Sequence, residues 1–340
     1  MIPFTKSLHV LILITSLPLK GIAAIGPEPI RVIGKTMGTT YHITYFDDHQ
    51  RDFTISIDSL FLMVNKSINT YDQTSEVSVF NRSERGVSFK LPYLYPPLAK
   101  AQEVYQASDG AFDPTVMPLV NAWGFGPETA TDPDYHHVDS IRNFVGFDKI
   151  SISQDSVSKS DPRVQLDFGG IGQGYGADVV SDYLRSKGIH NFLVELGGEG
   201  VASGTNIKTR KPWQVGITDP QSTLENQFLK AYVSLTDRSF TTAGNYFNYR
   251  MTDGKRYSHT IDPSTGYPAD RNILSASVFS KDCMTADAWD TAFMVMGHER
   301  AIEVLKHHPE LDALILYTGA DGKIKSYVTR GMKHNIKIEP

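Results

Sequence analysis

The chain has 340 residues, of which 40% are hydrophobic and 21% are charged, and its formal net charge at pH 7 is −5. These values are typical of a globular protein with one large or two modest domains. The acidic balance and the lack of any basic run argue against a nucleic-acid partner and leave no electrostatic basis for binding a membrane surface.

The N-terminus has the pattern of a secretory signal peptide. Lys6 precedes an apolar run at residues 8–14. This run is well short of the roughly 20 residues that span a bilayer. Small residues around Ala23 then suit cleavage, so we predict a signal peptide over residues 1–23, export to the periplasm, and one mature domain over residues 24–340. The alternative is a buried N-terminal strand or helix.

Hydrophobic periodicity predicts strands and helices along the rest of the chain. In chain order these are a strand at residues 41–45, helices at 57–68, 97–108 and 179–184, strands at 191–195, 213–217, 231–235, 257–261 and 274–279, helices at 284–296 and 299–307, and a strand at 313–317. Strands that occur in runs, without strict alternation with helices, favour an α+β fold over a doubly wound sheet.

Cys283 is the single cysteine in the sequence, so an intramolecular disulfide cannot form. It lies far from the N-terminus and therefore cannot serve as a lipoprotein anchor. Its position at the predicted start of an apolar helix favours a packing role over a nucleophilic one.

The segment LDFGGIGQGYGAD, residues 166–178, concentrates five glycines between a predicted strand and a predicted helix. Glycine at this density belongs where the backbone turns sharply or approaches a ligand closely. A glycine turn that leads into a helix presents unpaired N–H groups and the positive end of the helix dipole. The segment therefore predicts a site for a phosphate or a nucleotide.

Three shorter clusters carry reactive side chains, and each is also explained by ordinary structure. Residues 110–115 place an aromatic ring beside a carboxylate in a turn, and residues 241–246 read as a hydroxyl-rich turn. Residues 258–263 end a predicted strand with His259 before an Asp-Pro turn. A lone histidine of this kind is usually a hydrogen-bonded structural side chain.

Asp287 and Thr291 are four residues apart in a predicted helix, so both oxygens project from one face. A carboxylate and a hydroxyl are hard ligands that suit Mg²⁺ better than zinc or copper. Standing alone, the pair fits a solvated helix face better than a metal site.

A competing pattern is Gly172-x-Gly174-x-x-Ala177, which follows a predicted strand and opens a predicted helix. Glu195 lies 23 residues after Gly172, as in the dinucleotide fingerprint of a Rossmann domain. The neighbouring elements argue against this hypothesis because they do not alternate between strand and helix.

Five motifs in a fixed order discriminate better than any one of them. They are KTMGT at residues 35–39, GAFD at 110–113, LDFGGIGQGYGAD at 166–178, SHTIDP at 258–263 and A-D-x-x-x-T at 286–291. In this order the chain resembles the ApbE family, the FAD:protein FMN transferases, from about Lys35 to the C-terminus. The resemblance implies an α+β fold with mixed or antiparallel sheets, packed helices and a T-fold-like core.

The resemblance also implies the site residues. The contacts to FAD, the substrate, would be Met37, Tyr71, Ala111, Phe112, Asp113, Asp167, Gln173 and Ile261. The Mg²⁺ ligands would be the backbone carbonyl of Gly170 and the side chains of Asp287 and Thr291. Such a set is physically reasonable, because glycine lets a carbonyl approach a cation and because aromatic rings can pack on an isoalloxazine.

One residue departs from the pattern that the resemblance implies. Gln173 stands where the family often has a lysine in its GGIAKGY segment. A lysine would bring a positive charge to the pyrophosphate, whereas a glutamine offers a neutral hydrogen bond. More of the charge neutralisation is then left to the metal, and water could compete with the protein acceptor.

The expected activity is Mg²⁺-dependent transfer of FMN from FAD to a threonine or serine of a partner redox protein, with release of AMP. The acceptor would be a subunit of a sodium-pumping or electron-transfer complex, such as one at the inner membrane. Asp287 is the predicted catalytic metal ligand. His259 is the candidate general base because its usual pKa lies near neutrality, and an aspartate that does not bind metal is its rival.

Three alternatives stay open from the sequence. The same site could hydrolyse FAD to FMN and AMP, which is the possibility that Gln173 raises. The chain could be a periplasmic flavin-binding module without catalysis, which would leave the Asp287–Thr291 pair without a purpose. The third alternative is the nicotinamide dehydrogenase on a Rossmann domain.

Overall fold

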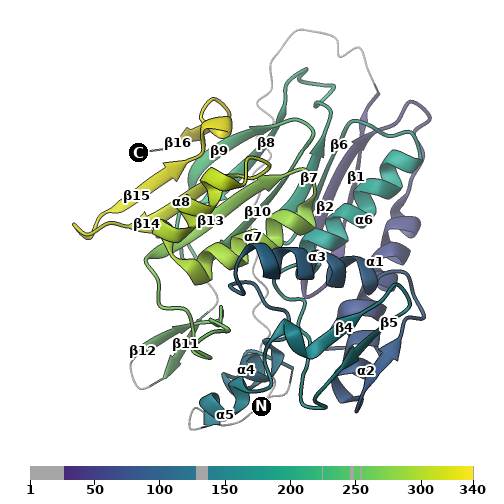
Figure 1. Cartoon of the computed structure of the whole chain (residues 1–340). Coiled ribbons are helices and arrows are strands. Elements are labelled where there is room, and N and C mark those ends of the chain that lie inside the picture. Colours follow the sequence, from purple (N-terminus) through teal and green to yellow (C-terminus); the bar gives the residue numbers. More distant parts are fainter. Residues whose placement is uncertain (1–26, 128–136, 224, 246–248, 253–254, 340) are drawn as a thin grey trace.

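The computed structural model describes residues 27–127, 137–223, 225–245, 249–252 and 255–339 (Figure 1). The predicted signal peptide, residues 1–23, lies outside the described residues. Within the described residues, no helix combines the length and the apolar character that a membrane span requires.

The centre of the molecule is an eight-stranded sheet. In spatial order its strands are β1 (Pro29–Thr36), β2 (Thr39–Phe46), β6 (Phe192–Leu196), β7 (Glu199–Ser203), β10 (Arg238–Gly244), β13 (Ile273–Ser280), β14 (Asp312–Thr318) and β15 (Ile324–Val328). Every neighbouring pair in it is antiparallel. The neighbours β2 and β6, β7 and β10, and β10 and β13 are not consecutive in the chain, so long connections join them.

This antiparallel order overturns the Rossmann hypothesis, which needs parallel strands joined by helices. Glu195, the acidic residue of that fingerprint, lies on β6 with its carboxylate 2.8 Å from Nδ1 of His42 on the neighbouring strand β2. The glycine pattern at residues 172–177 therefore has another purpose.

Helices cover one face of the sheet (Figure 1). They are α1 (Thr54–Ile68), α3 (Tyr95–Ala107), α6 (Gly172–Ser186), α7 (Cys283–Met296) and α8 (His298–His307). Their apolar stripes bury large side chains in the core beneath them, among them Phe61 from α1, Leu98 from α3, which packs on α7, and Phe293 from α7. This burial of apolar surface is the main stabilising contribution to the helical layer.

A second, three-stranded sheet covers part of the opposite face. Its order is β16 (Ile336–Ile338), β9 (Leu229–Leu235) and β8 (Trp213–Thr218), so β8 is an edge strand. Trp213 and Val215 from β8 pack with Phe240 and Phe279 of the main sheet in an apolar core. The inward side chains of the two sheets thus form a sandwich on this side of the molecule.

The remaining described elements lie around the helical layer. They are α2 (Glu76–Arg82), the sheet of β3 (Gly86–Ser88), β5 (Ser156–Lys159) and β4 (Ile150–Ile152), the helices α4 (Met117–Ala122) and α5 (Val138–Arg142), the hairpin of β11 (Tyr249–Thr252) and β12 (Lys255–Ser258), and two 3₁₀ turns at Phe147–Lys149 and Arg330–Met332. Figure 1 shows α4, α5 and the hairpin below the main sheet.

The α+β prediction is confirmed, but three local predictions are wrong. The backbone before the glycine turn is no strand, because Leu166 hydrogen-bonds through its N–H and its carbonyl to the side chain of Asn81. Residues 241–244 form no turn, because they continue β10 and pair with β13. The strand predicted at residues 257–261 ends at Ser258, whose hydroxyl accepts a hydrogen bond from the N–H of residue 260.

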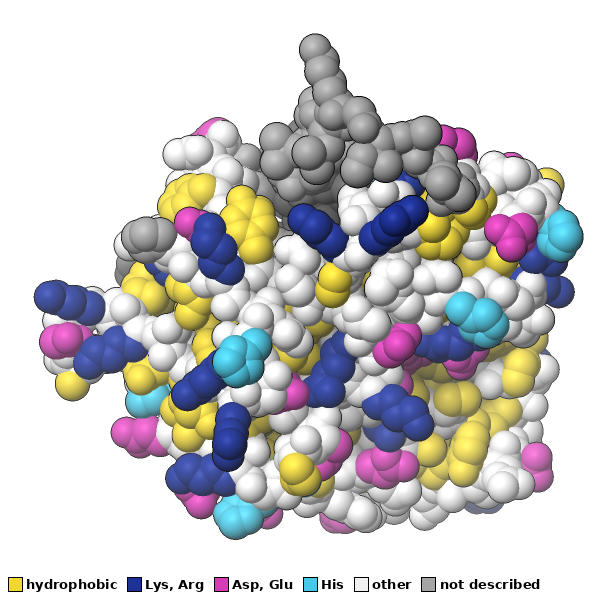
Figure 2. All heavy atoms as spheres, turned by 90° about the horizontal axis from the view of Figure 1, so that it is seen from above, with side chains coloured by type: hydrophobic (Ala, Val, Ile, Leu, Met, Phe, Trp, Pro, Cys, Tyr) yellow, Lys and Arg dark blue, Asp and Glu magenta, His cyan; other side chains and the backbone are white. Residues whose placement is uncertain are grey.

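Charges of both signs are mixed on the surface. Figure 2 shows one face on which basic and acidic side chains are interspersed without a large area of one sign. Pairs such as Arg51–Asp47 and Arg185–Asp182, at 2.7 and 2.9 Å, have the same mixed character. In the first pair Asp47 is buried, whereas both partners of Arg185–Asp182 are exposed. An exposed pair of the second kind contributes little to stability, typically less than about 1 kcal/mol.

Candidate active site

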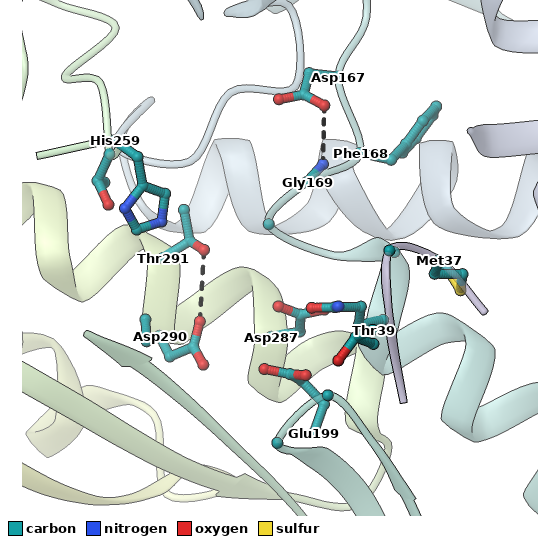
Figure 3. Close-up of a pocket in the computed structure, with 18 of the residues that line it drawn as sticks. Met37, Thr39, Asp167, Phe168, Gly169, Glu199, His259, Asp287, Asp290 and Thr291 are labelled. Atoms are coloured by element: carbon teal, nitrogen blue, oxygen red, sulfur yellow. Dashed lines mark hydrogen bonds between the residues drawn. The ribbon is translucent and has the colours of Figure 1, made fainter. Parts of the chain in front are cut away.

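A cavity of about 960 Å³ opens between the N-terminal end of α6, one face of α7 and the β1–β2 turn (Figure 3). All residues that the sequence analysis selected line it: Met37, Tyr71, Ala111, Phe112, Asp113, Asp167, Gly170, Gln173, His259, Ile261, Asp287 and Thr291. Six segments that are far apart in the sequence thus meet at one place. The individual roles of these residues stay predictions.

The β1–β2 turn carries Met37 into the cavity wall. Met37 and Gly38 both have positive φ, 49° and 75°, as a two-residue hairpin turn between antiparallel strands requires. A Cβ added to Gly176 would lie 3.1 Å from the sulfur of Met37, so this glycine of α6 leaves the space that Met37 fills. The turn is therefore fixed against the first turns of α6.

Two glycines before and in α6 permit close contact with α7. A Cβ on Gly170 would lie 2.7 Å from Oγ1 of Thr291, and one on Gly174 would lie 2.8 Å from Cβ of Asp287. The N–H of Gly174 donates a hydrogen bond of 2.8 Å to Oδ2 of Asp287. The motif thus serves helix packing as well as the ligand approach that the sequence predicts.

Three buried carboxylates form the floor of the cavity. Figure 3 shows Asp287 and Asp290 on α7 and Glu199 at the start of β7, all near the glycine turn. Burial raises the pKa of Asp287 to about 7, and the hydrogen bond from Gly174 opposes this rise. Burial, followed by the charges of Asp287 and Asp290, raises the pKa of Glu199 well above its usual value. Burial and the charge of Asp287 raise that of Asp290 similarly.

Polar atoms in this floor lack partners. Oε2 of Glu199 and Oγ1 of Thr39 are buried and have no hydrogen-bond partner among the described residues. Of the described residues that line the cavity, Lys35 is the single lysine or arginine. Buried carboxylates without a counter-charge cost free energy, so the floor suits a cation as ligand.

The donor set fits a hard cation. No group of three or more histidine, cysteine, aspartate or glutamate side chains that could hold a metal occurs in the described part of the chain. A cation at the floor would therefore need neutral oxygens besides Asp287. Thr291 carries a hydroxyl and packs against Gly170, whose backbone has a carbonyl, and oxygen donors are what Mg²⁺ prefers.

Asp290 and Glu199 were missed by the sequence analysis. Asp290 could have been found, because its i,i+3 spacing from Asp287 places both carboxylates on neighbouring positions of one helix face. Glu199 follows Gly197 and Gly198 in a turn between two strands, and nothing in its local sequence indicates that it faces α7.

The ApbE family model matches residues 37–315. The chain belongs to the ApbE family. It is 36% identical to a Vibrio cholerae protein named FAD:protein FMN transferase, over 313 residues that make up 90% of this chain and 92% of the relative. It is 35% identical to the Haemophilus influenzae protein of that name, over 85% of this chain and 87% of the relative.

Solved structures agree with this assignment. The fold is similar to that of the flavin transferase ApbE from Vibrio cholerae, with a TM-score of 0.81 and 35% identity over 91% of this chain and 99% of the other. It is also similar to the apo form of the Pseudomonas stutzeri flavinyl transferase ApbE, with a TM-score of 0.79 and 29% identity over 91% and 97% of the two chains. The likeness extends over nearly all of each chain.

In this ApbE-family chain, the side chains of Gln173 and Glu199 both end beside Gly197. A Cβ on Gly197 would lie 2.9 Å from Nε2 of Gln173 and 3.2 Å from Oε2 of Glu199. A lysine at residue 173 would therefore bring its charge to Glu199 as well as to a ligand. The glutamine at residue 173 is neutral and therefore cannot compensate a negative charge on Glu199.

The far side of the cavity is more apolar and more open. Phe112 is buried, whereas the ring of Tyr71 is 64% exposed and its hydroxyl donates a 3.2 Å hydrogen bond to the carbonyl of Phe125. Asp113 accepts bonds from the N–H and hydroxyl of Thr115, but burial raises its pKa to about 6. Flat aromatic surface beside a polar wall is suited to a planar ring system.

His259 reaches the cavity from the loop after β12. Figure 3 shows its imidazole near Thr291. Its ring also contacts the ring of Phe125 edge-on, with the centroids 6.5 Å apart. The imidazole therefore lies between the open side of the cavity and the carboxylate floor.

Proposed function

We propose that this ApbE-family protein transfers FMN from FAD to a threonine or serine hydroxyl of a partner redox protein, and that it requires Mg²⁺. The observation that carries the proposal is the floor of Asp287, Asp290 and Glu199, which adjoins the glycine turn and forms no ion pair with any described lysine or arginine. The names of the relatives support the flavin and the protein acceptor.

The proposed Mg²⁺ ligands are the carbonyl of Gly170 and the side chains of Asp287 and Thr291. Bound there, the ion would supply positive charge to the diphosphate oxygens. Asp290 and Glu199 lie nearby, and a divalent cation bound beside them would favour their ionised forms, which burial disfavours. Met37 and Phe112 would hold the flavin, and Asp167 and Gln173 would contact the dinucleotide closer to the floor.

The proposed reaction forms one bond and breaks one. The hydroxyl oxygen of the acceptor attacks the phosphorus of the FMN half, and the bond from this phosphorus to the bridging oxygen breaks. AMP leaves with the bridging oxygen, and the hydroxyl proton passes to His259, the proposed general base. Positioning and neutralisation of charge are the main demands of such a transfer.

The test combines two measurements on the purified protein. A candidate acceptor domain is incubated with FAD and Mg²⁺, and its mass should rise by one FMN while AMP is released in equal amount. A parallel reaction without acceptor measures hydrolysis. AMP that accumulates there over many turnovers, with no gain in acceptor mass, would identify a pyrophosphatase. Bound flavin with no AMP in either reaction would identify a binding protein.

We also propose that the protein is exported to the periplasm and acts on an acceptor at the inner membrane. The support is the signal-like sequence at residues 1–23. Fractionation of cells that express the full chain, with sequencing of the mature N-terminus, tests this. Recovery of the uncleaved chain from the cytoplasm would contradict it.

A further inference from the structure

The cavity continues beyond the residues that the predicted FAD contacts use. Its lining includes Phe240 and Phe279, which belong to the apolar core between the two sheets. It also includes Val215 and Ile217 of β8. This second lobe therefore extends past the floor to the face of the main sheet that is opposite to α7.

The second lobe meets the edge of β8. Four consecutive residues of this strand line the cavity: Val215, Gly216, Ile217 and Thr218. Successive residues of a strand point to opposite faces, so a cavity that touches all of them must face the strand from its side. That side is unpaired among the described residues, because β8 is the last strand of the order β16-β9-β8.

The lobe meets a second strand edge on β10. Three consecutive residues, Thr242, Ala243 and Gly244, line the cavity. β10 pairs with β13 along residues 239–244, but its pairing with β7 covers residues 238–240 alone. Within the described residues, the segment 242–244 thus has no strand on the side where a longer β7 would lie.

This free edge lies beside the carboxylate floor. α7, which carries Asp287 and Asp290, packs on β10, and β7 begins at Glu199 directly where its pairing with β10 stops. A chain that ran along the edge of β10 would therefore pass the floor within one or two residues. Edge strands offer rows of N–H and carbonyl groups that bind extended peptides irrespective of most of their side chains.

We propose that an extended segment of the acceptor protein binds in this second lobe as an added strand along Thr242–Gly244 of β10, with β8 on its other side. The inference rests on the proposed transfer function and adds the binding mode of its protein substrate. The lobe is lined by two strand edges, which suits a polypeptide backbone. The acceptor hydroxyl would then reach the floor from the side opposite to the flavin.

The test separates acceptor binding from FAD binding. The substitution Thr242→Tyr adds bulk on the face where Thr242 hydrogen-bonds to Ser277, at 2.9 Å, and so narrows the lobe. Transfer to a co-expressed, threonine-containing acceptor domain should fall by about tenfold or more. FAD binding, measured by flavin fluorescence, and AMP release without acceptor should stay within about twofold of the wild type.

Two matched variants serve as controls. Thr242→Val keeps the size of the side chain and removes the hydroxyl, so transfer should persist. Gln214→Tyr places the same new ring on β8 but on its exposed face, where Gln214 hydrogen-bonds to Ser234. It should leave transfer unchanged.

Photo-crosslinking gives a second measurement. It uses the wild-type enzyme, so its result does not depend on whether Thr242→Tyr folds. A benzophenone residue placed two positions from the acceptor threonine should crosslink, in the wild-type enzyme, to residues 215–218 or 242–244. Crosslinks confined to the surface around Tyr71 would overturn the inference, as would normal transfer by Thr242→Tyr. If the wild type transfers no FMN to the acceptor, the proposed function fails, and the inference falls with it.

Discussion

The contact between α6 and α7 and the cavity floor beside it both bury carboxylates, but with opposite consequences. Asp178 on α6 accepts hydrogen bonds of 2.8 Å from the N–H groups of Cys283 and Met284, at the N-terminal end of α7. Glu199, in the floor, has a buried oxygen with no partner among the described residues. The first arrangement stabilises the fold, because it satisfies two helix N–H groups and complements the helix dipole. The second favours binding of a cation.

The substitution expected to have the largest effect is Asp287→Ala in the floor. Removal of this carboxylate should lower FMN transfer by about 10²-fold or more, because the site loses its predicted metal ligand. The remaining activity should no longer respond to Mg²⁺, as measured by initial rates across a Mg²⁺ titration. Asp182→Ala, the same change at an exposed position of α6, should behave like the wild type. Metal-dependent transfer by Asp287→Ala would remove this residue from the site.

In the helix contact, Asp178→Ala should instead reduce stability. It leaves the two N–H groups at the start of α7 unpaired, which should lower the free energy of unfolding by about 2–4 kcal/mol. Urea denaturation at pH 8 is suitable, because burial raises the pKa of Asp178 to about 7 and the carboxylate is ionised above it. Asp182→Ala, which breaks an exposed ion pair, should lower the free energy of unfolding by less than about 1 kcal/mol. Equal losses in the two variants would contradict the stabilising role of Asp178.

The floor also predicts how pH affects the metal-free protein. The pKa of Asp287 in the fold is about 7, above the usual 3.8, so the native state holds a proton that the unfolded chain releases. Stability is then fully present below pH 3.8 and is lost as pH rises toward 7, by at most about 1.4 kcal/mol per pH unit for one group.

Thermal unfolding in a metal chelator, followed from pH 5 to pH 8, measures this effect. Asp287→Asn should reduce the dependence, since the amide does not titrate, while Glu199 and Asp290, whose pKa values burial also raises, still contribute. Added Mg²⁺ should raise the melting temperature more at pH 8 than at pH 5, because the ion binds the ionised carboxylate. A Mg²⁺ effect that is the same at both pH values would argue against a carboxylate ligand.

The smallest expected effect is that of Gln173→Lys. The ammonium group would approach Glu199 and the proposed position of the diphosphate, so FAD should bind several-fold more tightly. The Mg²⁺ concentration that gives half-maximal transfer should fall as well. Gln173→Met, which has similar length and no charge, separates the effect of charge from that of size. If both variants bind FAD equally, the glutamine does not limit charge neutralisation.

Local periodicity predicted those parts of the site that lie within one element. Asp287 and Thr291 were found because a helix fixes the relation between residues four apart. The glycine turn at residues 169–174 was found because its composition restricts the backbone. The order of motifs then connected these elements to the ApbE family and to its α+β fold.

Contacts set by the order of strands were not predictable in this way. Glu199 faces Asp287 because β7 lies between β6 and β10, and this order is a property of the whole sheet. The free edge of residues 242–244 likewise exists because β7 is shorter than β10. Residues 241–246 looked like a turn because hydroxyl groups and glycine favour turns locally, while pairing with β13 overrides that preference.

The cavity brings together a segment from the start of the described chain and one from its later part. The hairpin that presents Met37 is the first pair of strands in the described residues, whereas α7, which carries Asp287, follows much later in the chain. A chain that ends before α7 therefore lacks Asp287, Asp290 and Thr291 of the cavity. If FAD binds through the proposed floor, its capture should therefore require a chain that extends through α7.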